Sequence, residues 1–177
     1  MKVVVTGGAG FVGSNLVRHL EHVPEVTETI VLDDLSFGFR DNLDGVRTTL
    51  VEGSILDEAL LEEVFTAAGA VVHLAARSSV PRSVAHPMAA HEANATGTVR
   101  VLEAARRAGD VHVIVASSSS VYGANEVLPK HENLATRPVS PYAASKLATE
   151  AYTLAWGHSY DMPVLALRLF NVFGPLQ

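Results

Sequence analysis

A cluster of glycines directly after the first apolar run constrains the fold of this chain more than any other feature. Residues 6–13 read Thr-Gly-Gly-Ala-Gly-Phe-Val-Gly, so Gly8, Gly10 and Gly13 match GxGxxG, while Gly7, Gly10 and Gly13 match GxxGxxG. Glycines in this pattern allow a tight turn, a close approach of backbone to a pyrophosphate and close helix–strand packing. Free amides at the start of the following helix would bind a diphosphate. The segment predicts a dinucleotide-binding loop, and the alternative is a plain turn.

Short β-branched runs alternate with longer helical patterns along the rest of the chain. Several runs are apolar on both faces, which is typical of parallel strands covered by helices. We expect an α/β fold, a doubly wound parallel sheet with strand order 3-2-1-4-5-6, in one domain over residues 1–177. The expected strands are 3–5, 29–32, 48–51, 70–75, 111–117 and 164–169, and the expected helices are 11–21, 57–67, 86–108 and 141–160.

An acidic residue at the end of the second expected strand indicates which dinucleotide the loop binds. Asp33 follows Gly13 by about 20 positions, where a carboxylate accepts the ribose hydroxyls of NAD and repels the 2′-phosphate of NADP. The pattern therefore predicts an NAD-binding Rossmann domain. Asp34 is adjacent and either also meets the adenosine or is a loop acid.

The overall charge and composition exclude several classes of protein. Lys plus Arg number 13 against 19 Asp plus Glu, a net charge of −6, which offers no surface for nucleic acid or an anionic membrane. No cysteine is present, the eight histidines lack ligand spacing, and no metal site is expected. No run reaches the roughly 18 apolar residues of a membrane span, and the first apolar run is too short for a signal peptide. We expect a cytoplasmic protein. His73, inside an expected strand, is expected to be a core histidine.

The second chemical motif is a tyrosine and a lysine four residues apart. Tyr142 and Lys146 share one face of a helix that Ser140 would cap and Pro141 would begin. A tyrosine has a pKa of about 10, and lowering it to about 7 requires roughly 4 kcal/mol of preference for the phenolate. Lys146 and the positive nicotinamide of NAD are the candidate sources. After a dinucleotide loop, this pair predicts a catalytic base and its partner; alone it would be a solvated helix face.

Four serines end the fifth expected strand, at the sheet edge where ligands of open α/β folds bind. One hydroxyl of the run 117–120 is expected to hold the reacting proton near Tyr142, with Ser118 favoured over Ser119. The alternative is that the serines only bond local backbone. The long polar loop 123–139 follows and is a candidate functional segment.

At this point the chain resembles a known family. The segments TGGAGFVGS, VLDDLS, HLAA, ASSSSVYG, SPYAASK and LRLFNVFGP resemble the extended short-chain dehydrogenases/reductases, and within them the NAD-dependent UDP-sugar 4-epimerases. The resemblance implies Tyr142 as base, Lys146 as its partner and ribose ligand, and Ser118 as the hydroxyl on the substrate oxygen. It places Asn94 behind the active site. The implied substrate contacts are Ser118, Ser119, Tyr142 and Asn171, and the implied cofactor contacts are Gly7, Gly10, Phe11, Val12, Gly13, Asp33, Asp34, Ser54, Ile55, Leu74, Ala75, Ala76, Tyr142 and Lys146.

Three departures from the family pattern matter. Ser54 stands where many members have an aspartate that touches adenine. Ser119 and Ser120 stand where sugar 4,6-dehydratases carry an Asp-Glu pair, so elimination of water is disfavoured. The resemblance implies a smaller substrate-binding domain after the sixth strand, which we expect to be absent from these 177 residues.

The resulting expectation is an enzyme that epimerises carbon 4 of a UDP-sugar with NAD, through a transient 4-keto sugar. This chain alone would bind cofactor with little turnover. The alternatives are another nucleotide-sugar oxidoreductase, or a catalytically silent NAD-binding module. A homodimer is also expected, through the apolar helices around 99–108 and 142–156. Which sugar is used, and whether the chain is a natural truncation, stay open.

Overall fold

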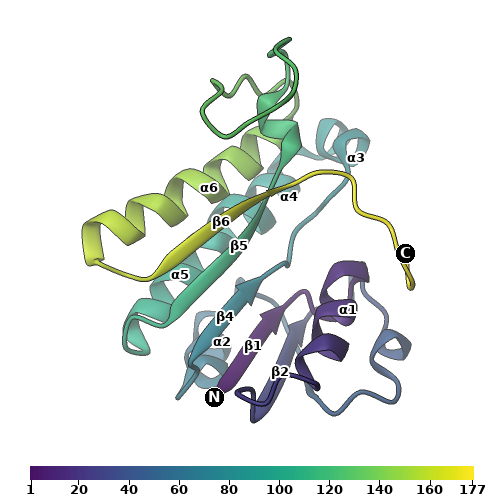
Figure 1. Cartoon of the computed structure of the whole chain (residues 1–177), viewed down its shortest axis with the longest axis vertical. Helices are drawn as coiled ribbons and strands as arrows, with labels where there is room; N and C mark the ends of the chain where they lie inside the picture. The colour runs from purple at the N-terminus through teal and green to yellow at the C-terminus, as the bar shows by residue number, and fades with distance from the viewer.

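A six-stranded parallel sheet forms the centre of the molecule in the computed structural model, which describes residues 1–177 (Figure 1). The strand order is β3-β2-β1-β4-β5-β6, which confirms the predicted doubly wound topology. Neighbouring strands pair in parallel throughout, for example Val4 with both Ile30 and Val71. The strands are β1 (Lys2–Thr6), β2 (Glu28–Asp33), β3 (Thr49–Glu52), β4 (Ala70–His73), β5 (His112–Ser118) and β6 (Val164–Leu169).

The helices follow the expected order, with one addition and one division. They are α1 (Phe11–Leu20), α2 (Glu58–Phe65), α3 (Val80–Ala85), α4 (Pro87–His91), α5 (Gly97–Arg107) and α6 (Pro141–Tyr160). The single helix expected over 86–108 is α4, a π-helical stretch η2 (Glu92–Thr96) and α5. Short 3-10 turns η1 (Arg40–Leu43) and η3 (Ser119–Tyr122) lie in the connections. The strand expected over 70–75 ends at His73, because the chain there leaves the sheet to line a cavity.

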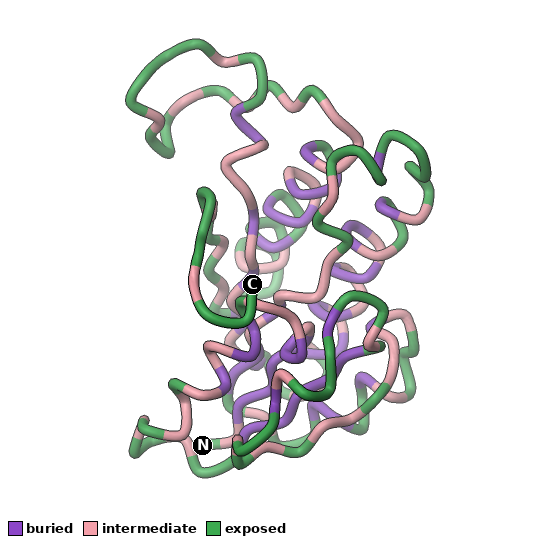
Figure 2. Tube along the Cα trace, turned by 90° about the vertical axis from the view of Figure 1, so that its right-hand side faces the viewer, coloured by how far each residue is buried: buried purple, intermediate pink, exposed green.

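Two apolar cores lie on opposite faces of the sheet, because side chains alternate along each strand. Val4 of β1 points into the larger core with α2, α5 and Met162, while Val3 and Val5 pack with α1 and Leu43. Figure 2 shows buried residues concentrated in the strands and on the inner helix faces. By contrast, none of the residues from 123 to 140 is buried.

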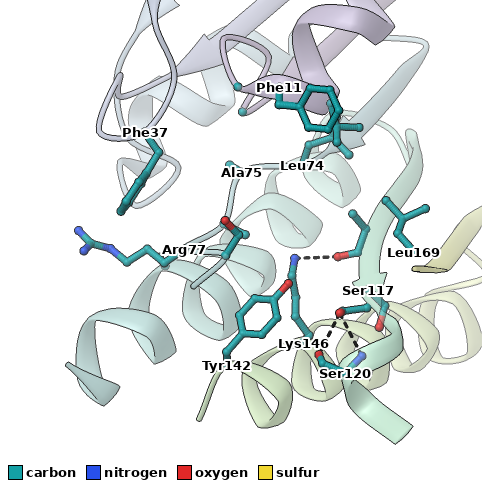
Figure 3. Close-up of a pocket in the computed structure, with 18 of the residues that line it drawn as sticks. Phe11, Phe37, Leu74, Ala75, Arg77, Ser117, Ser120, Tyr142, Lys146 and Leu169 are labelled. Carbon is teal, nitrogen blue, oxygen red and sulfur yellow. Dashed lines mark hydrogen bonds between the residues drawn. The ribbon is translucent and has the colours of Figure 1, made fainter. Parts of the chain in front are cut away.

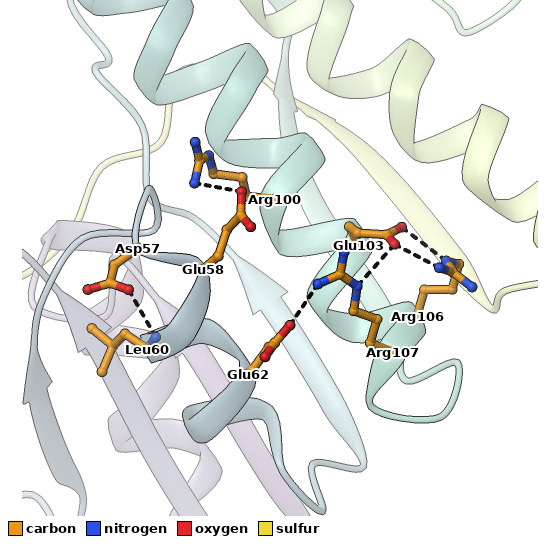
Figure 4. Close-up of polar contacts among 8 residues, drawn as sticks. All are labelled: Asp57, Glu58, Leu60, Glu62, Arg100, Glu103, Arg106 and Arg107. Atoms are coloured by element: carbon orange, nitrogen blue, oxygen red, sulfur yellow. Dashed lines mark hydrogen bonds and ion pairs between the residues drawn. The ribbon is translucent and has the colours of Figure 1, made fainter.

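Ion pairs on the surface join α2 to α5 (Figure 4). Arg107 donates to Glu62 across the two helices at 2.7 Å and to Glu103 within α5 at 3.2 Å. Arg100 pairs with Glu58 at 2.9 Å. Exposed pairs of this kind contribute about 0–1 kcal/mol each, so they are a minor addition to the apolar contact between α2 and α5.

Candidate active site

One large cavity of about 1460 Å³ lies along the carboxyl ends of the strands. This is the edge at which open α/β sheets bind ligands. Every residue that the sequence assigned to cofactor or substrate lines this cavity: Gly7, Gly10, Phe11, Val12, Gly13, Asp33, Asp34, Ser54, Ile55, Leu74, Ala75, Ala76, Ser118, Ser119, Tyr142, Lys146 and Asn171. The cavity exceeds the roughly 300–1000 Å³ of a site for one drug-sized ligand, so it is large enough for a ligand of dinucleotide size.

The glycine loop between β1 and α1 forms one wall of this cavity. Gly7 has φ +73°, and a Cβ on it would lie 2.5 Å from the backbone nitrogen of Ala75. A Cβ on Gly13 would lie 2.3 Å from the carbonyl oxygen of Gly7. Gly10 precedes α1 and has no side chain to cap it, so the first-turn amides stay free for an anion. The loop therefore has the close packing and the free donors that a diphosphate site requires.

Asp33 ends β2 and faces the cavity with a buried carboxylate, 7% exposed. One oxygen accepts a hydrogen bond from the Ala9 amide at 3.0 Å and the other from the Leu35 amide at 2.9 Å. Burial raises the pKa of Asp33, and these two amides partly offset that increase. Asp34 differs, because it bonds the amide of Ser36 within its own exposed loop. The donors and the carboxylate in this half of the cavity fit an NAD diphosphate and ribose.

Tyr142 and Lys146 enter the other half of the cavity from the first two turns of α6 (Figure 3). Ser140 caps this helix by accepting a hydrogen bond from the Ala143 amide at 3.1 Å, and Pro141 is the first helical residue, as predicted. The Lys146 ammonium is 6% exposed and donates to the carbonyl oxygen of Ala116 on β5 at 2.7 Å. Because the ammonium bonds one protein acceptor, its other N–H groups can donate hydrogen bonds to the hydroxyls of a ligand.

Burial is the largest influence on the protonation of Tyr142 in the protein without cofactor. Burial raises the pKa of Tyr142 above its ordinary 10, and a hydrogen bond with the Ser118 side chain only partly offsets this. Burial also lowers the pKa of Lys146, to about 8. The physical reason is that loss of water disfavours both charged forms. The protein alone therefore holds a neutral phenol.

Ser118 is the serine of the 117–120 run whose hydroxyl interacts with Tyr142. It also accepts hydrogen bonds from the Ser120 hydroxyl at 2.9 Å and the Ser120 amide at 3.2 Å. Ser119 lines the same cavity from η3. Ser117 also lines the cavity, and its hydroxyl donates to Glu150 of α6 at 2.9 Å.

A buried polar network supports α6 from behind. The Asn94 side-chain oxygen accepts from the Arg77 amide at 2.7 Å, and its amide nitrogen donates to Ser145 of α6 at 2.8 Å. His73 is buried between the hydroxyls of Thr6 at 2.7 Å and Thr98 at 3.1 Å. Burial lowers the His73 pKa to about 3, so the ring is neutral, as expected of a core histidine.

Four residues in or near the cavity are not predicted by the sequence motifs. Phe37 lines the cavity, and the guanidinium groups of Arg77 and Arg82 lie 5.6 and 5.0 Å from its ring centre. Ser83 accepts a hydrogen bond from the backbone amide of Tyr142 at 3.0 Å. A signal for α3, which carries Arg82 and Ser83, was present in the sequence. Ser79 caps this helix, and a proline stands in its first turn.

No group of three or more histidine, aspartate or glutamate side chains is placed to hold a metal ion. None of the helices is at once long enough and apolar enough to span a bilayer.

A family model described as the NAD dependent epimerase/dehydratase family matches residues 3–177. The chain belongs to this family. It is 38% identical to the UDP-glucose 4-epimerase of Azospirillum brasilense over 98% of this chain and 49% of that protein. The chain thus spans about half the length of this curated relative.

Two solved structures of the epimerase/dehydratase family match the whole chain. A UDP-glucose 4-epimerase from Thermotoga maritima with UDP-glucose has a TM-score of 0.94 and 37% identity, over 100% of this chain and 58% of that one. A dTDP-glucose 4,6-dehydratase from Streptomyces venezuelae with NAD bound has a TM-score of 0.95 and 39% identity, with the same coverage. Relatives of the chain therefore include both epimerases and dehydratases of nucleotide sugars, and the family depends on NAD.

Proposed function

We propose that this chain is the NAD-binding and catalytic domain of an enzyme that epimerises carbon 4 of a UDP-sugar of the glucose/galactose type. The observation that carries the proposal is the chemistry of the cavity around Tyr142. The lining residues of β5, η3 and α6, together with Asn171 just after β6, contribute hydroxyls, two phenols, an ammonium and an amide, but no carboxyl group. This set can move one proton at a sugar hydroxyl and bind the oxygen left behind.

Each of these residues has a separate role in the proposed reaction. NAD supplies a hydride acceptor and, in its oxidised form, a positive charge. Tyr142 takes the proton from the sugar 4-hydroxyl, and Ser118 donates a hydrogen bond to the same oxygen. Lys146 binds ribose hydroxyls of the cofactor. Asn171 and Ser119 contact the substrate. A 4-keto sugar is the transient intermediate. After it has turned over, carbon 4 takes back the hydride that the cofactor had accepted, and Tyr142 returns the proton to the oxygen.

The raised pKa of Tyr142 makes the base dependent on the cofactor. A neutral phenol cannot accept the proton, and burial keeps it neutral in the protein alone. A nearby positive charge stabilises the phenolate and lowers its pKa. We therefore expect the base to form only in the complex with oxidised NAD, which restricts proton abstraction to the complex that can also accept hydride.

The second candidate function is 4,6-dehydration of a dTDP-sugar, which some relatives perform. Ser119 and Ser120 stand where the sugar 4,6-dehydratases of this family carry an Asp-Glu pair. A hydroxyl is a far weaker acid and base than a carboxyl group near neutral pH, so elimination of water is disfavoured here. A reductase or dehydrogenase, or a silent NAD-binding module, are the remaining candidates.

The complete protein that contains this chain, incubated with UDP-galactose and NAD, should release UDP-glucose without net formation of NADH. Phenylalanine at position 142 is the matched control: it keeps the ring, removes the hydroxyl, and should bind NAD without turnover. Formation of a 4-keto-6-deoxy sugar from dTDP-glucose would favour the dehydratase instead. Net NADH would indicate a dehydrogenase, and NAD binding without turnover of any UDP-sugar would indicate a silent module.

Three further expectations belong to this proposal. Residues 1–177 form the NAD-binding domain, and the residues that choose the sugar lie in the part of the relatives' length that this chain does not span. The enzyme works in the cytoplasm, which fractionation of cells would test.

It also forms a homodimer through α5 and α6. Leu154 is 53% exposed on α6, and Tyr152, Trp156 and Tyr160 form an edge-to-face stack along another face of the same helix. Light scattering should give a dimer, and Leu154→Glu should give a monomer.

A further inference from the structure

Glu150 is a buried carboxylate on α6 that the proposed chemistry does not use. It lies one helical turn after Lys146 and two after Tyr142, so the three side chains share one face of the helix. Glu150 is 7% exposed. It accepts hydrogen bonds from the Arg168 guanidinium, at 2.9 Å from Nε, and from the Ser117 hydroxyl at 2.9 Å. These bonds hold the pKa of Glu150 below its ordinary value, with Arg168 as the largest cause, so the pair is ionised at neutral pH.

Arg168 extends these contacts from α6 to three other segments. It belongs to β6, three residues before Asn171. Its Nη1 donates to the carbonyl oxygen of Glu132 in the loop before α6 at 3.1 Å. Its guanidinium carbon lies 4.9 Å from the ring centre of Tyr122 in η3. One ion pair therefore joins α6, β5, β6 and η3 at the carboxyl edge of the sheet.

The polar contacts between α6 and β5 occur at successive turns of the helix. Lys146 donates to the Ala116 carbonyl, and one turn later Glu150 accepts from Ser117. Apolar packing of a helix on a sheet tolerates small sliding, whereas directional bonds at fixed spacing specify one register. The position of the phenol relative to the strand-end hydroxyl depends on that register.

We propose that Glu150 is a positioning residue that fixes Tyr142, Ser118 and Asn171 relative to one another. Its bond with Ser117 restrains the adjacent Ser118, and its bond with Arg168 restrains the end of β6, which lies two residues before Asn171. The inference rests on the proposed function for the roles of those three residues. Glu150 itself lies outside the cavity lining and touches neither substrate nor cofactor.

Glu150→Gln tests this with little change of shape, and Glu103→Gln is the matched control. Glu103 is also paired with arginine, but lies on α5 away from the cavity. In the complete protein, Glu150→Gln should lower kcat about 10- to 100-fold, with KM and NAD affinity within about twofold, because misplacement by about 1 Å costs about that much. Glu103→Gln should leave all three unchanged.

Hydrogen exchange of the 177-residue chain gives a readout that does not depend on turnover. Glu150→Gln should speed exchange in segments 116–122 and 168–172, with no change in the glycine loop at 6–13. If the parent protein epimerises nothing, the proposed function fails while this exchange pattern still decides the positioning role. Exchange that rises evenly over all segments, or a kcat within twofold of the parent in a folded variant, would overturn the positioning role and leave Glu150 as a stability residue only.

Discussion

Replacing Lys146 by methionine should make the folded chain more stable at neutral pH. Burial lowers the pKa of Lys146 from 10.5 to about 8. At about 1.4 kcal/mol per pKa unit, the buried ammonium costs the folded state roughly 3 kcal/mol at neutral pH. Methionine has a similar length and no charge, but it loses the hydrogen bond to the Ala116 carbonyl, which contributes about 1 kcal/mol. The expected net gain is roughly 2 kcal/mol, together with loss of turnover.

The pH dependence isolates this contribution of Lys146. Between pH 8 and 10.5 the unfolded chain binds the lysine proton while the folded chain has released it. Stability rises with pH wherever the unfolded state binds more protons. The free energy of unfolding of the wild type should therefore rise relative to that of Lys146→Met over this pH range. The advantage of the methionine variant should then disappear. Lys146→Arg stays charged throughout and should show no such gain.

Urea unfolding of the wild type, Lys146→Met and Lys146→Arg at several pH values from 7 to about 11 would measure these differences. The differences between variants matter, because other groups titrate equally in all three. A methionine variant that is less stable than the wild type at pH 7, or a wild-type advantage that does not change with pH, would refute the reasoning. Lys146 would then be better solvated or better paired than its burial indicates.

Three other substitutions test separate parts of the structure. Gly7→Ala should lower the free energy of unfolding by more than about 2 kcal/mol, because the added Cβ meets the Ala75 backbone. Gly45→Ala has a similar φ of +72° but open space around the added Cβ, so it should cost only about 1 kcal/mol. Equal costs in urea unfolding would contradict the packing argument. Asp33→Asn should weaken NAD binding by about 10-fold and reduce the preference over NADP, and calorimetry showing unchanged affinities would exclude a ribose contact. Glu62→Gln, which breaks an exposed ion pair, should change stability by less than about 1 kcal/mol, so a larger loss in urea unfolding would contradict a minor role.

The fold could be predicted from the sequence because the signals for it are local. Period-two and period-3.6 patterns and the glycine loop fix the six strands and their order. The π-helical stretch at 92–96 was not predicted, since one extra residue in a turn leaves the apolar pattern of a helix almost unchanged. Helix α3 has only six residues and too little periodicity to stand out. Both omissions lie next to the cavity.

The candidate site was predictable in its membership but not in its electrostatics. Motifs place Tyr142, Lys146 and Ser118 at one sheet edge, yet the tyrosine pKa depends on burial and on where the ammonium points, which spacing does not encode. The ion pair of Glu150 and Arg168 joins residues that only the tertiary fold brings together. An acid one turn beyond Lys146 and an arginine inside an apolar strand were the available signals.

The proposed function requires the nicotinamide of NAD to lie at the carboxyl edge of the sheet, between the glycine loop and α6. A crystal structure of the chain with NAD tests it most directly. We expect the diphosphate on the first-turn amides of α1 and the adenosine ribose on Asp33. The nicotinamide ribose should lie within hydrogen-bonding distance of Lys146, with Tyr142 facing the ring. A nicotinamide outside this cavity, or a Tyr142 side chain turned to bulk water in the complex, would contradict it.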